Sequence, residues 1–455
     1  MINDTLYYII SGGIIVLILL GIFLMSKVKT ARFGNGLSAL AILGATITIL
    51  LKYEIINLWQ LHIYFQIGII IGLLMAFKVK MIQMPQMIAL LNGLGGLAST
   101  IVGVFALYHI GADETLFSTY ASMLAITVGN TAFIGSIVAA LKLHRVISQK
   151  PLKIKFYGFI IIINLLLMLT LIVIKPFVDI NILYYVIGAI ILSLLFGFIF
   201  SMSIGGADMP ITISLLNSLS GIAASISGLA IGDPLLVSIG AVVGASGLIL
   251  TRIMSKAMNK TILEIILGKT TTTIKKTEEE PQDDYVQTKD PYVIFKASKN
   301  VIIVPGYGMA VAQAQFLVKE LTDHIKSKDG HVRFAIHPVA GRMPGHMNVL
   351  LAEVDIDYDD LYDMDMINED FKDTDLVIVI GANDVINPKA KTDASTPLYG
   401  MPILDVADAK NIFIFNYDTK PGYSGVDNPL YHGDVHLFLG DAKDTLKAFI
   451  EEIKL

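Results

Sequence analysis

The sequence predicts two folds in one chain: a polytopic α-helical membrane domain of about nine spans, then an α/β domain with a Rossmann-like, doubly wound parallel sheet. The 455 residues are 54% hydrophobic and only 16% charged, with a mean hydropathy of +0.66. Apolar stretches fill the first 254 residues, and short β-branched runs alternate with helical stretches after residue 300. A bilayer is therefore the expected solvent for the first part and water for the second.

Most of the apolar stretches approach the roughly 20 residues that a helix needs to cross a bilayer. Basic residues gather in alternate loops, including Lys29, Lys78, Lys142 and Lys150. By the positive-inside rule these loops are cytoplasmic. This predicts a multi-pass protein of the cell inner (plasma) membrane with an external N-terminus and a cytoplasmic C-terminal domain. The spans are expected at residues 6–25, 35–51, 58–77, 85–108, 119–141, 156–174, 180–202, 211–231 and 234–254.

Charge divides the chain, because residues 1–290 carry a net charge of +5 and residues 291–455 one of −10. A polar, threonine-rich stretch without apolar periodicity lies between them. We therefore expect a membrane domain over 1–258, a linker over 259–290 and a soluble domain over 291–455. The acidic soluble domain argues against nucleic acid as a partner. The absence of cysteine excludes disulfides, zinc–thiolate sites and thiol catalysis, and no metal site is predicted.

An internal repeat lies within the membrane domain. Residues 84–92 and 209–217 share the pattern Met-Pro-x-x-Ile-x-Leu-Leu-Asn, at the start of the fourth and eighth spans. At 1.5 Å per helical residue, Asn92 and Asn217 lie roughly 10 Å into the membrane. Such amides either join helices that pack through small residues or line a hydrated path. Their duplication at one depth favours the path.

No titratable side chain is expected at the middle of any span. A proton that crosses this domain would then need water, the two asparagines or a group donated by a partner. Asp208, in the loop before the eighth span, stands at the predicted cytoplasmic mouth. A lone loop carboxylate is ordinarily a solvated turn residue, and only the neighbouring repeat favours a role in proton passage.

In the soluble domain, Gly306-Tyr-Gly308 follows the first predicted strand and opens a helix. In this arrangement the backbone can approach a pyrophosphate. The second strand ends in Ile336-His337, without the acid that ordinarily holds an adenine ribose. The adenosine end is then held elsewhere, or the nucleotide lies the other way round. The strands are expected at 301–304, 332–336, 376–380, 412–415 and 437–439, with helices near 309–327, 345–353 and 441–453.

Four strings at the ends of these strands are specific: Pro-Gly-Tyr-Gly-Met-Ala-Val from Pro305, His-Pro-Val-Ala-Gly-Arg-Met-Pro-Gly-His from His337, Gly-Ala-Asn-Asp from Gly381 and Gly-Tyr-Ser-Gly from Gly422. With them the chain resembles the β subunit of proton-translocating NAD(P) transhydrogenases. The resemblance covers essentially the whole chain, including Gly-Ala-Asp-Met-Pro before the eighth span.

The resemblance implies that the soluble domain binds NADP(H) in an orientation reversed from ordinary dinucleotide folds. It also implies a separate α subunit that binds NAD(H), and a homodimer of such heteromers. Hydride would pass directly between the two nicotinamides, coupled to proton passage through the membrane domain. The cofactors then supply the chemistry and the protein orients them.

The same resemblance assigns roles to residues of this chain. Asp384 is the group expected to sense protonation; the internal repeat, and not the resemblance, assigns Asp208, Asn92 and Asn217 to the proton path. The alternative for Asp384 is a carboxylate that caps a strand-to-loop turn. The expected nucleotide contacts are Gly306, Tyr307, Gly308 and Val311 at the phosphates; Val339, Ala340, Gly341, Arg342, Met343 and Pro344 in one loop; Gly381, Ala382, Asn383 and Asp384 near the nicotinamide; Gly422 and Tyr423 in a lid; and Asp441 and Ala442 beside them.

The chain departs from the family in two places. Where the family usually carries Lys-Arg-Ser for the 2′-phosphate, this chain has Asn416-Tyr-Asp418, with Lys420 nearby. Since a 2′-phosphate is usually held by Arg or Lys, we expect a weaker preference for NADP(H) over NAD(H), with Lys420 and Arg342 as remaining ligands. Where many members have a histidine in the fourth span, this chain has Asn92, so the proton-binding group is expected from the α subunit.

Two other classes of function compete with this interpretation. A nucleotide-sensing gated ion channel would keep an acid after its second strand, and a potassium pore would need a Thr-Val-Gly-Tyr-Gly filter. The nearest string, Thr127-Val-Gly-Asn130, lacks the Tyr-Gly of that filter. A secondary transporter with a structural nucleotide domain is supported only by the internal repeat.

The loop charges make a prediction about topology. Reporter proteins fused after Glu114 and after Lys150 should report an external and a cytoplasmic position respectively, because the basic loops stay inside. Activity of a periplasmic reporter such as alkaline phosphatase measures this. Equal activities at the two positions would contradict the nine-span topology.

Overall fold

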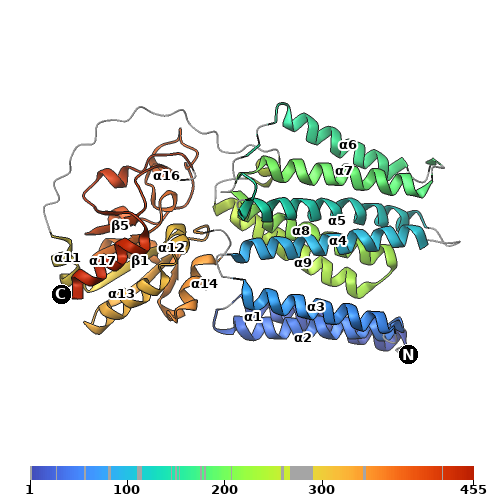
Figure 1. Ribbon diagram of the computed structural model, residues 1–455, viewed down its shortest axis with the longest axis horizontal. Coiled ribbons are helices and arrows are strands. Elements are labelled where there is room, and N and C mark those ends of the chain that lie inside the picture. Colours follow the sequence, from blue (N-terminus) through green and yellow to red (C-terminus); the bar gives the residue numbers. More distant parts are fainter. Residues whose placement is uncertain are drawn as a thin grey trace. The chain divides into compact units, whose positions relative to one another are not determined.

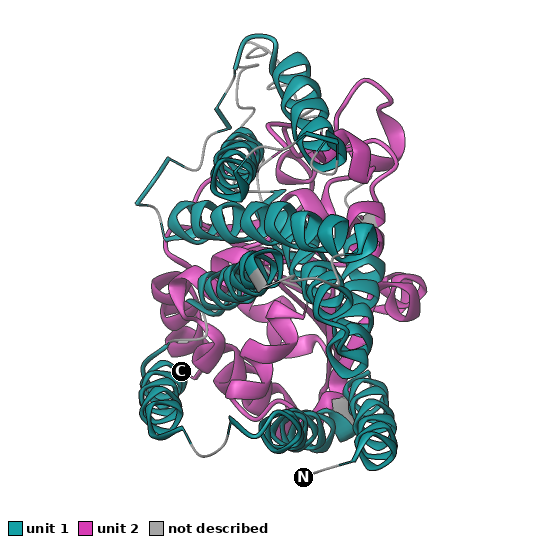
Figure 2. Cartoon of the chain, turned by 90° about the vertical axis from the view of Figure 1, so that its right-hand side faces the viewer, with its two compact units in different colours: residues 1–251 teal, residues 252–455 magenta. Residues whose placement is uncertain are grey.

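The computed structural model divides into two compact units, residues 1–251 and 252–455 (Figure 2). The predicted linker contains one short helix, α10 (Ile262–Ile266), and the rest of it from 267 to 289 lies outside the described residues. The structure describes residues 3–26, 28–55, 58–79, 83–109, 115–144, 146–148, 151–152, 154–174, 177–178, 181–205, 208–257, 261–266, 290–341, 345–422 and 424–454.

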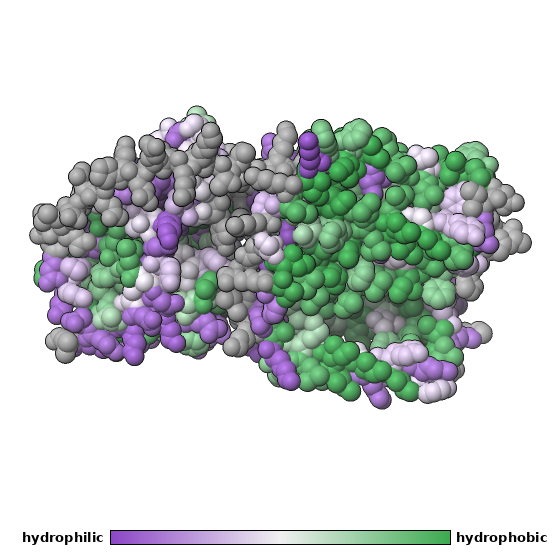
Figure 3. Space-filling view, turned by 45° about the horizontal axis from the view of Figure 1, so that its top comes forward, coloured by the Kyte–Doolittle hydropathy of each residue, from purple (hydrophilic) through white to green (hydrophobic). Residues whose placement is uncertain are grey.

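Unit 1 consists of long apolar helices. Within the described residues, nine helices are long and apolar enough to cross a membrane, which confirms the predicted number of spans. Hydrophobic side chains cover the surface of these helices, whereas much of the surface of unit 2 is hydrophilic (Figure 3). The helices are α1 (Asp4–Met25), α2 (Val28–Lys52), α3 (Trp59–Lys78), α4 (Met84–His109), α5 (Leu116–Leu143), α6 (Tyr157–Ile174), α7 (Ile182–Ser203), α8 (Met209–Ile231) and α9 (Pro234–Ala257) (Figure 1).

Helix α5 is the interior helix of unit 1. It packs against α4, α7 and α8. Of an apolar stretch of 18 residues in α5, 67% is buried, compared with 0% of the corresponding stretch in α3. Polar side chains join these helices: the Asn130 amide of α5 donates to the Ser193 hydroxyl of α7 at 2.9 Å. Polar groups in lipid need such partners, so they fix which helices are neighbours.

Unit 2 is a six-stranded parallel sheet in the order β3-β2-β1-β4-β5-β6. This is the strand order of a doubly wound dinucleotide fold. Strand β3 was not predicted, because three residues give too short a pattern to recognise. The strands are β1 (Asn300–Pro305), β2 (His331–Ile336), β3 (Leu361–Asp363), β4 (Leu376–Ile380), β5 (Ile412–Asn416) and β6 (His436–Leu439).

Helices cover both faces of this sheet. On one face, Phe449 of α17 packs edge-on against Phe413 and Phe415 of β5. On the other, Ile367 and Phe371 pack in a core with alternate residues of β1, β4 and β5. The helices of unit 2 beyond α10 are α11 (Pro291–Ala297), α12 (Tyr307–Ala312), α13 (Gln315–Ser327), α14 (His346–Glu353), α15 (Met364–Ile367), α16 (Lys389–Thr392) and α17 (Ala442–Lys454).

The helix predicted over 309–327 is two helices, α12 and α13. Gln313 adopts a left-handed conformation, with φ of 53°, which ends α12 before α13 begins. Nothing in the sequence marks this break, since no glycine or proline lies there.

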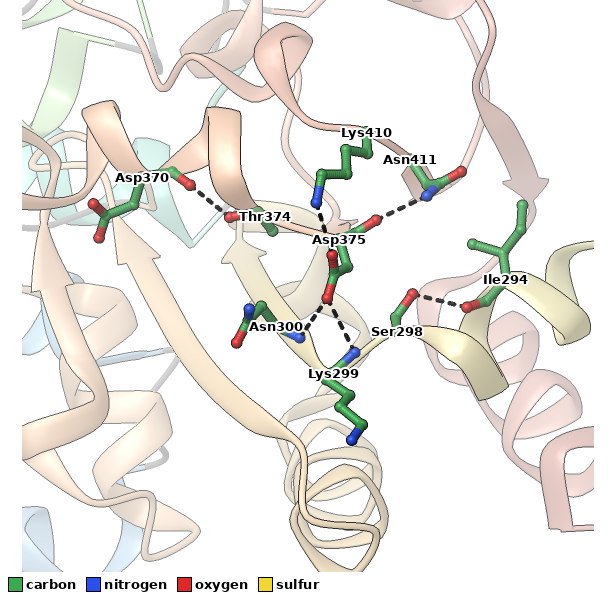
Figure 4. A network of polar contacts seen from close by, with 9 residues as sticks. All are labelled: Ile294, Ser298, Lys299, Asn300, Asp370, Thr374, Asp375, Lys410 and Asn411. Carbon is green, nitrogen blue, oxygen red and sulfur yellow. Dashed lines mark hydrogen bonds and ion pairs between the residues drawn. The ribbon is translucent and has the colours of Figure 1, made fainter.

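A polar network around Asp375 joins three strands at their amino ends (Figure 4). The Asp375 carboxylate accepts from the main-chain N–H of Asn300 at 3.0 Å and of Lys299 at 3.3 Å, and from the Lys410 ammonium at 3.0 Å. Its main-chain oxygen accepts from the Asn411 amide at 2.8 Å. The Asn300 N–H and the Lys410 ammonium hold the pKa of Asp375 below its usual value. The network therefore fixes the starts of β1, β4 and β5, and leaves their carboxyl ends for a site.

Candidate functional site

The segments that follow the parallel strands β1 and β4 lie in direct backbone contact. This close approach of Gly306 and Gly308 to Gly381 is called the glycine crossing. The N–H of Gly306 donates to Ile380 O and the N–H of Gly308 to Gly381 O, both at 2.8 Å. A Cβ on Gly308 would lie 2.6 Å from the Gly381 Cα, and Gly381 has φ of +67°. Only glycine allows this approach and this backbone angle. The structure thus brings two of the predicted glycine clusters together.

This crossing lies where the sheet order reverses. The chain leaves β1 for β2 on one side, and β4 lies on the other. In parallel sheets, ligands bind outside the carboxyl ends at this switch point. Tyr307 is half-buried in the first turn of α12, and Val311 is exposed on the same helix. Both predicted phosphate contacts therefore lie on the short helix that begins at this edge of the sheet.

The Asp384 carboxylate is bound by the predicted lid. The Ser424 hydroxyl donates to one of its oxygens at 2.7 Å and the Ser424 N–H to the other at 3.0 Å. A Cβ on Gly422 would lie 2.7 to 2.8 Å from the same carboxyl group. The carboxylate thus fastens the lid segment and does more than cap its own turn. Tyr423 lies outside the described residues.

Asn383 holds two further segments together. Its amide donates to Lys420 O at 3.0 Å, and its side-chain oxygen accepts from the Asn428 amide at 3.1 Å. Asn428 is completely buried. Sequence reasoning did not identify Asn428 or Ser424, because their partners are about forty residues distant; Asn428-Pro429 is a recognisable turn signal.

Asn416, at the end of β5, is engaged within the protein. Its amide donates to the Tyr431 hydroxyl at 2.6 Å and to Ala382 O at 3.2 Å. Burial raises the pKa of Tyr431, so this phenol is neutral. Both side chains support the Ala382 main chain next to Asp384. Tyr431 is another site residue that the sequence did not reveal.

The loop after β2 is anchored by His337. Its Nε2 lies 2.8 Å from Pro402 O, and its Nδ1 accepts from the Val339 N–H at 3.3 Å. Burial lowers the pKa of His337 to about 4. A neutral imidazole therefore holds Val339 and Ala340 at the edge of the site. Gly341 follows with φ of +101°, and the predicted contacts Arg342, Met343 and Pro344 lie outside the described residues.

The remaining predicted contacts are peripheral. The Lys420 ammonium lies 3.4 Å from the carboxylate of Asp418, so its charge is partly used within the loop. The Asp441 carboxylate accepts from the Lys443 N–H at 2.9 Å, next to Ala442 at the start of α17. This carboxylate caps the helix.

The two repeated asparagines of unit 1 differ in their contacts. The Asn92 amide donates to Ile213 O of α8 at 3.4 Å, and Asn92 O accepts from the Ser220 hydroxyl at 2.8 Å. No hydrogen bond joins the half-buried Asn217 amide to another described residue. Asp208, at the start of α8, is 6% exposed and so is not a solvated turn residue. Asn92 therefore joins α4 to α8, whereas the amide of Asn217 makes no hydrogen bond to another described residue.

Nine candidate membrane spans among the described residues and a second unit with the strand order of a dinucleotide fold define a membrane protein of two parts. The family described as NAD(P) transhydrogenase beta subunit matches residues 5–452. NAD(P) transhydrogenase subunit beta of Rhodospirillum rubrum is 39% identical over 457 residues, which cover 98% of this chain and 97% of that protein. A sequence of the same name from a designated strain of that bacterium is also 39% identical. The chain belongs to the NAD(P) transhydrogenase beta subunit family.

The depressed pKa of His337 predicts a pH dependence of stability. Between pH 6.5 and about 4 the unfolded chain binds a proton at this residue and the folded chain does not. The free energy of unfolding should therefore decrease as the pH is lowered from 6.5 to about 4, by about 3 kcal/mol at most. Urea unfolding of unit 2, produced without the membrane helices, measures it. A His337→Gln variant should lose that part of the pH dependence, and equal slopes in both proteins would refute the assignment.

The lid contact makes a second prediction. Ser424→Ala removes the hydroxyl bond to Asp384, and a hydrogen bond to a charged group is worth about 1.5 to 3 kcal/mol. Nucleotide release from unit 2 should then become at least about tenfold faster, as followed by stopped-flow fluorescence. Ser395→Ala is the matched control, because the Ser395 hydroxyl donates to Asp393 at 2.6 Å in an exposed loop. Equal release rates in the two variants would show that the lid contact plays no part in retention.

Proposed function

We propose that unit 2 binds NADP(H) outside the carboxyl ends of β1 and β4, and that an α subunit carrying NAD(H) completes the reaction. Hydride then passes from one nicotinamide to the other, coupled to proton passage through unit 1. The observation that carries this proposal is the Asp384 carboxylate, fastened by the lid serine beside the crossing of Gly308 and Gly381. A titratable group there connects protonation with retention of the nucleotide.

The chemistry of the transfer belongs to the nucleotides, which exchange two electrons and a proton as hydride. This chain supplies position. The backbone at Gly306 and Gly308 borders the phosphates, and the loop from Val339 to Pro344 contacts the nucleotide. Asn383 and Asp384 lie at the nicotinamide end under the lid from Gly422. The Asn416 amide is bonded to Tyr431 and is not available to a 2′-phosphate. The cations that remain for this phosphate are Lys420 and Arg342, so the preference for NADP(H) over NAD(H) is weak.

Protonation of Asp384 would weaken the lid. As a carboxylate it accepts from both the hydroxyl and the N–H of Ser424. A protonated carboxyl group loses acceptor capacity and charge, so both bonds weaken. Nucleotide affinity then depends on proton occupancy, and proton affinity depends equally on the nucleotide.

In unit 1, Asn217 orients water and does not itself bind the proton, because an amide is not protonated at physiological pH. A histidine or carboxylate of the α subunit binds the proton. Asp208, at the cytoplasmic end of α8, couples the protonation of that group to the soluble domain. The topology that follows has the N-terminus outside, unit 2 in the cytoplasm and the spans in the plasma membrane. The complete assembly is a homodimer of α–β heteromers.

Reconstitution tests this function. The chain alone in lipid vesicles should show no exchange between NAD(H) and NADP(H), because it contributes one nucleotide site and the reaction needs two. Addition of the α subunit should give exchange and proton uptake into the vesicles. Nucleotide-gated ion conductance without exchange would instead favour a channel, and solute uptake without exchange would favour a transporter.

A substitution at Asn217 tests the proton path. Asn217→Leu should reduce nucleotide-driven proton pumping at least about tenfold, because the amide that orients water is gone, while NADP(H) binding to unit 2 stays unchanged. Pumping is read from a pH-sensitive dye in vesicles with the α subunit. Asn164→Leu, which removes a buried amide from α6, is the control and should pump normally. Full pumping by Asn217→Leu would mean that Asn217 only packs helices.

A further inference from the structure

Lys142 is a cation buried within unit 1. It was expected in the loop after the fifth span, but it lies in the last turn of α5 with a side chain that is 0% exposed. Its ammonium donates to three main-chain oxygens at the end of α7: Met202 O at 2.7 Å, Ile204 O at 2.8 Å and Ser201 O at 3.1 Å. By contrast Lys78, in the last turn of α3, is exposed.

The end of α7 suits an ammonium group. The last carbonyls of a helix lack partners within the helix and carry partial negative charge. A charged lysine has three donors, and here each has a carbonyl acceptor. Burial of a charge is costly unless its contacts are complete. The ammonium and the α7 terminus therefore fix one another, and a neutral side chain would leave these carbonyls unsatisfied.

The carbonyls that Lys142 binds lie shortly before the start of α8 in the chain. Ile204 precedes Asp208 by four residues, and the Asp208 N–H donates to Gly205 O at 3.1 Å within that short connection. Leu143, the neighbour of Lys142, accepts from the Gln86 amide at 3.3 Å. Gln86 is in the first turn of α4. The end of α5 thus contacts the beginning of one repeat copy and, through Lys142, the chain that leads into the other.

We infer that Lys142 is a positioning residue for proton coupling. Its buried ammonium fixes the end of α7, and through the short connection it determines where Asp208 lies at the mouth of unit 1. This inference rests on the proposed function, because Asp208 takes part in coupling only if the chain pumps protons. Loss of the ammonium should leave hydride exchange possible and separate it from proton movement.

The test uses the full chain with the α subunit in lipid vesicles. The quantity measured is the coupling ratio, the number of protons pumped per hydride transferred, with exchange followed in the presence of an uncoupler. Lys142→Met keeps the length of the side chain and removes the donors. Its coupling ratio should fall at least fivefold, while the Kd for NADP(H) stays within twofold of wild type. The matched control Lys78→Met should keep the wild-type ratio.

A double variant separates positioning from general damage. Asp208→Asn should lower the coupling ratio by itself, and Lys142→Met/Asp208→Asn should be no worse than Asp208→Asn, because both changes act through Asp208. Independent, multiplying losses would overturn the inference. A normal ratio in Lys142→Met, with only less folded protein, would also overturn it. Absence of exchange and pumping in the wild type would instead refute the proposed function.

Conservative variants keep the test decisive if Lys142→Met does not accumulate. Lys142→Arg retains the charge and should recover at least half of the coupling ratio, whereas the neutral Lys142→Gln, with two donors, should not. Equal ratios in the arginine and glutamine variants would contradict a role for the charge at the end of α7.

Discussion

The backbone crossing of Gly306 and Gly308 with Gly381 is the constraint on which the proposed nucleotide site depends. Two main-chain hydrogen bonds of 2.8 Å close it, and any side chain at Gly308 would collide with Gly381. Because the crossing joins the ends of β1 and β4, it also sets the position of Asp384, three residues beyond Gly381. The lid through Ser424 and the buried Asn428 and Tyr431 then assemble around that position. The polar network is thus a consequence of glycine at three positions.

In unit 1, polar side chains fix how the apolar helices pack against one another. In lipid a polar atom needs a partner, and many described polar side chains of unit 1 join helices, as Asn130 joins α5 to α7 and Ser227 donates to Ser99 O of α4 at 3.1 Å. Asn217 is different, since its amide remains available. Lys142 is different again, because it carries a full charge inside. These two residues lie on α8 and α5, the helices to which the proposal assigns the path for protons.

Local patterns predicted much of this architecture. Apolar runs gave the nine spans, β-branched runs gave five of the six strands that the structure describes, and the glycine clusters marked the carboxyl edge of the sheet. What local patterns could not give depends on distant partners. The lid serine Ser424 is an ordinary hydroxyl until Asp384, forty residues earlier, faces it. Lys142 has the sequence context of a cytoplasmic loop cation, and only the end of α7 makes it a buried one. The break at Gln313 and the short β3 also lack a local signal.

The central claim is that the glycine crossing and the lid form one nucleotide site. Hydrogen–deuterium exchange of the full chain, with and without NADP(H), tests it without any substitution. Added nucleotide should slow exchange in residues 306–312, 381–386 and 424–428, and leave the Asp375 network at the opposite edge, near residues 299–300 and 410–411, unchanged. Protection at the Asp375 edge, or none in the lid, would contradict the account.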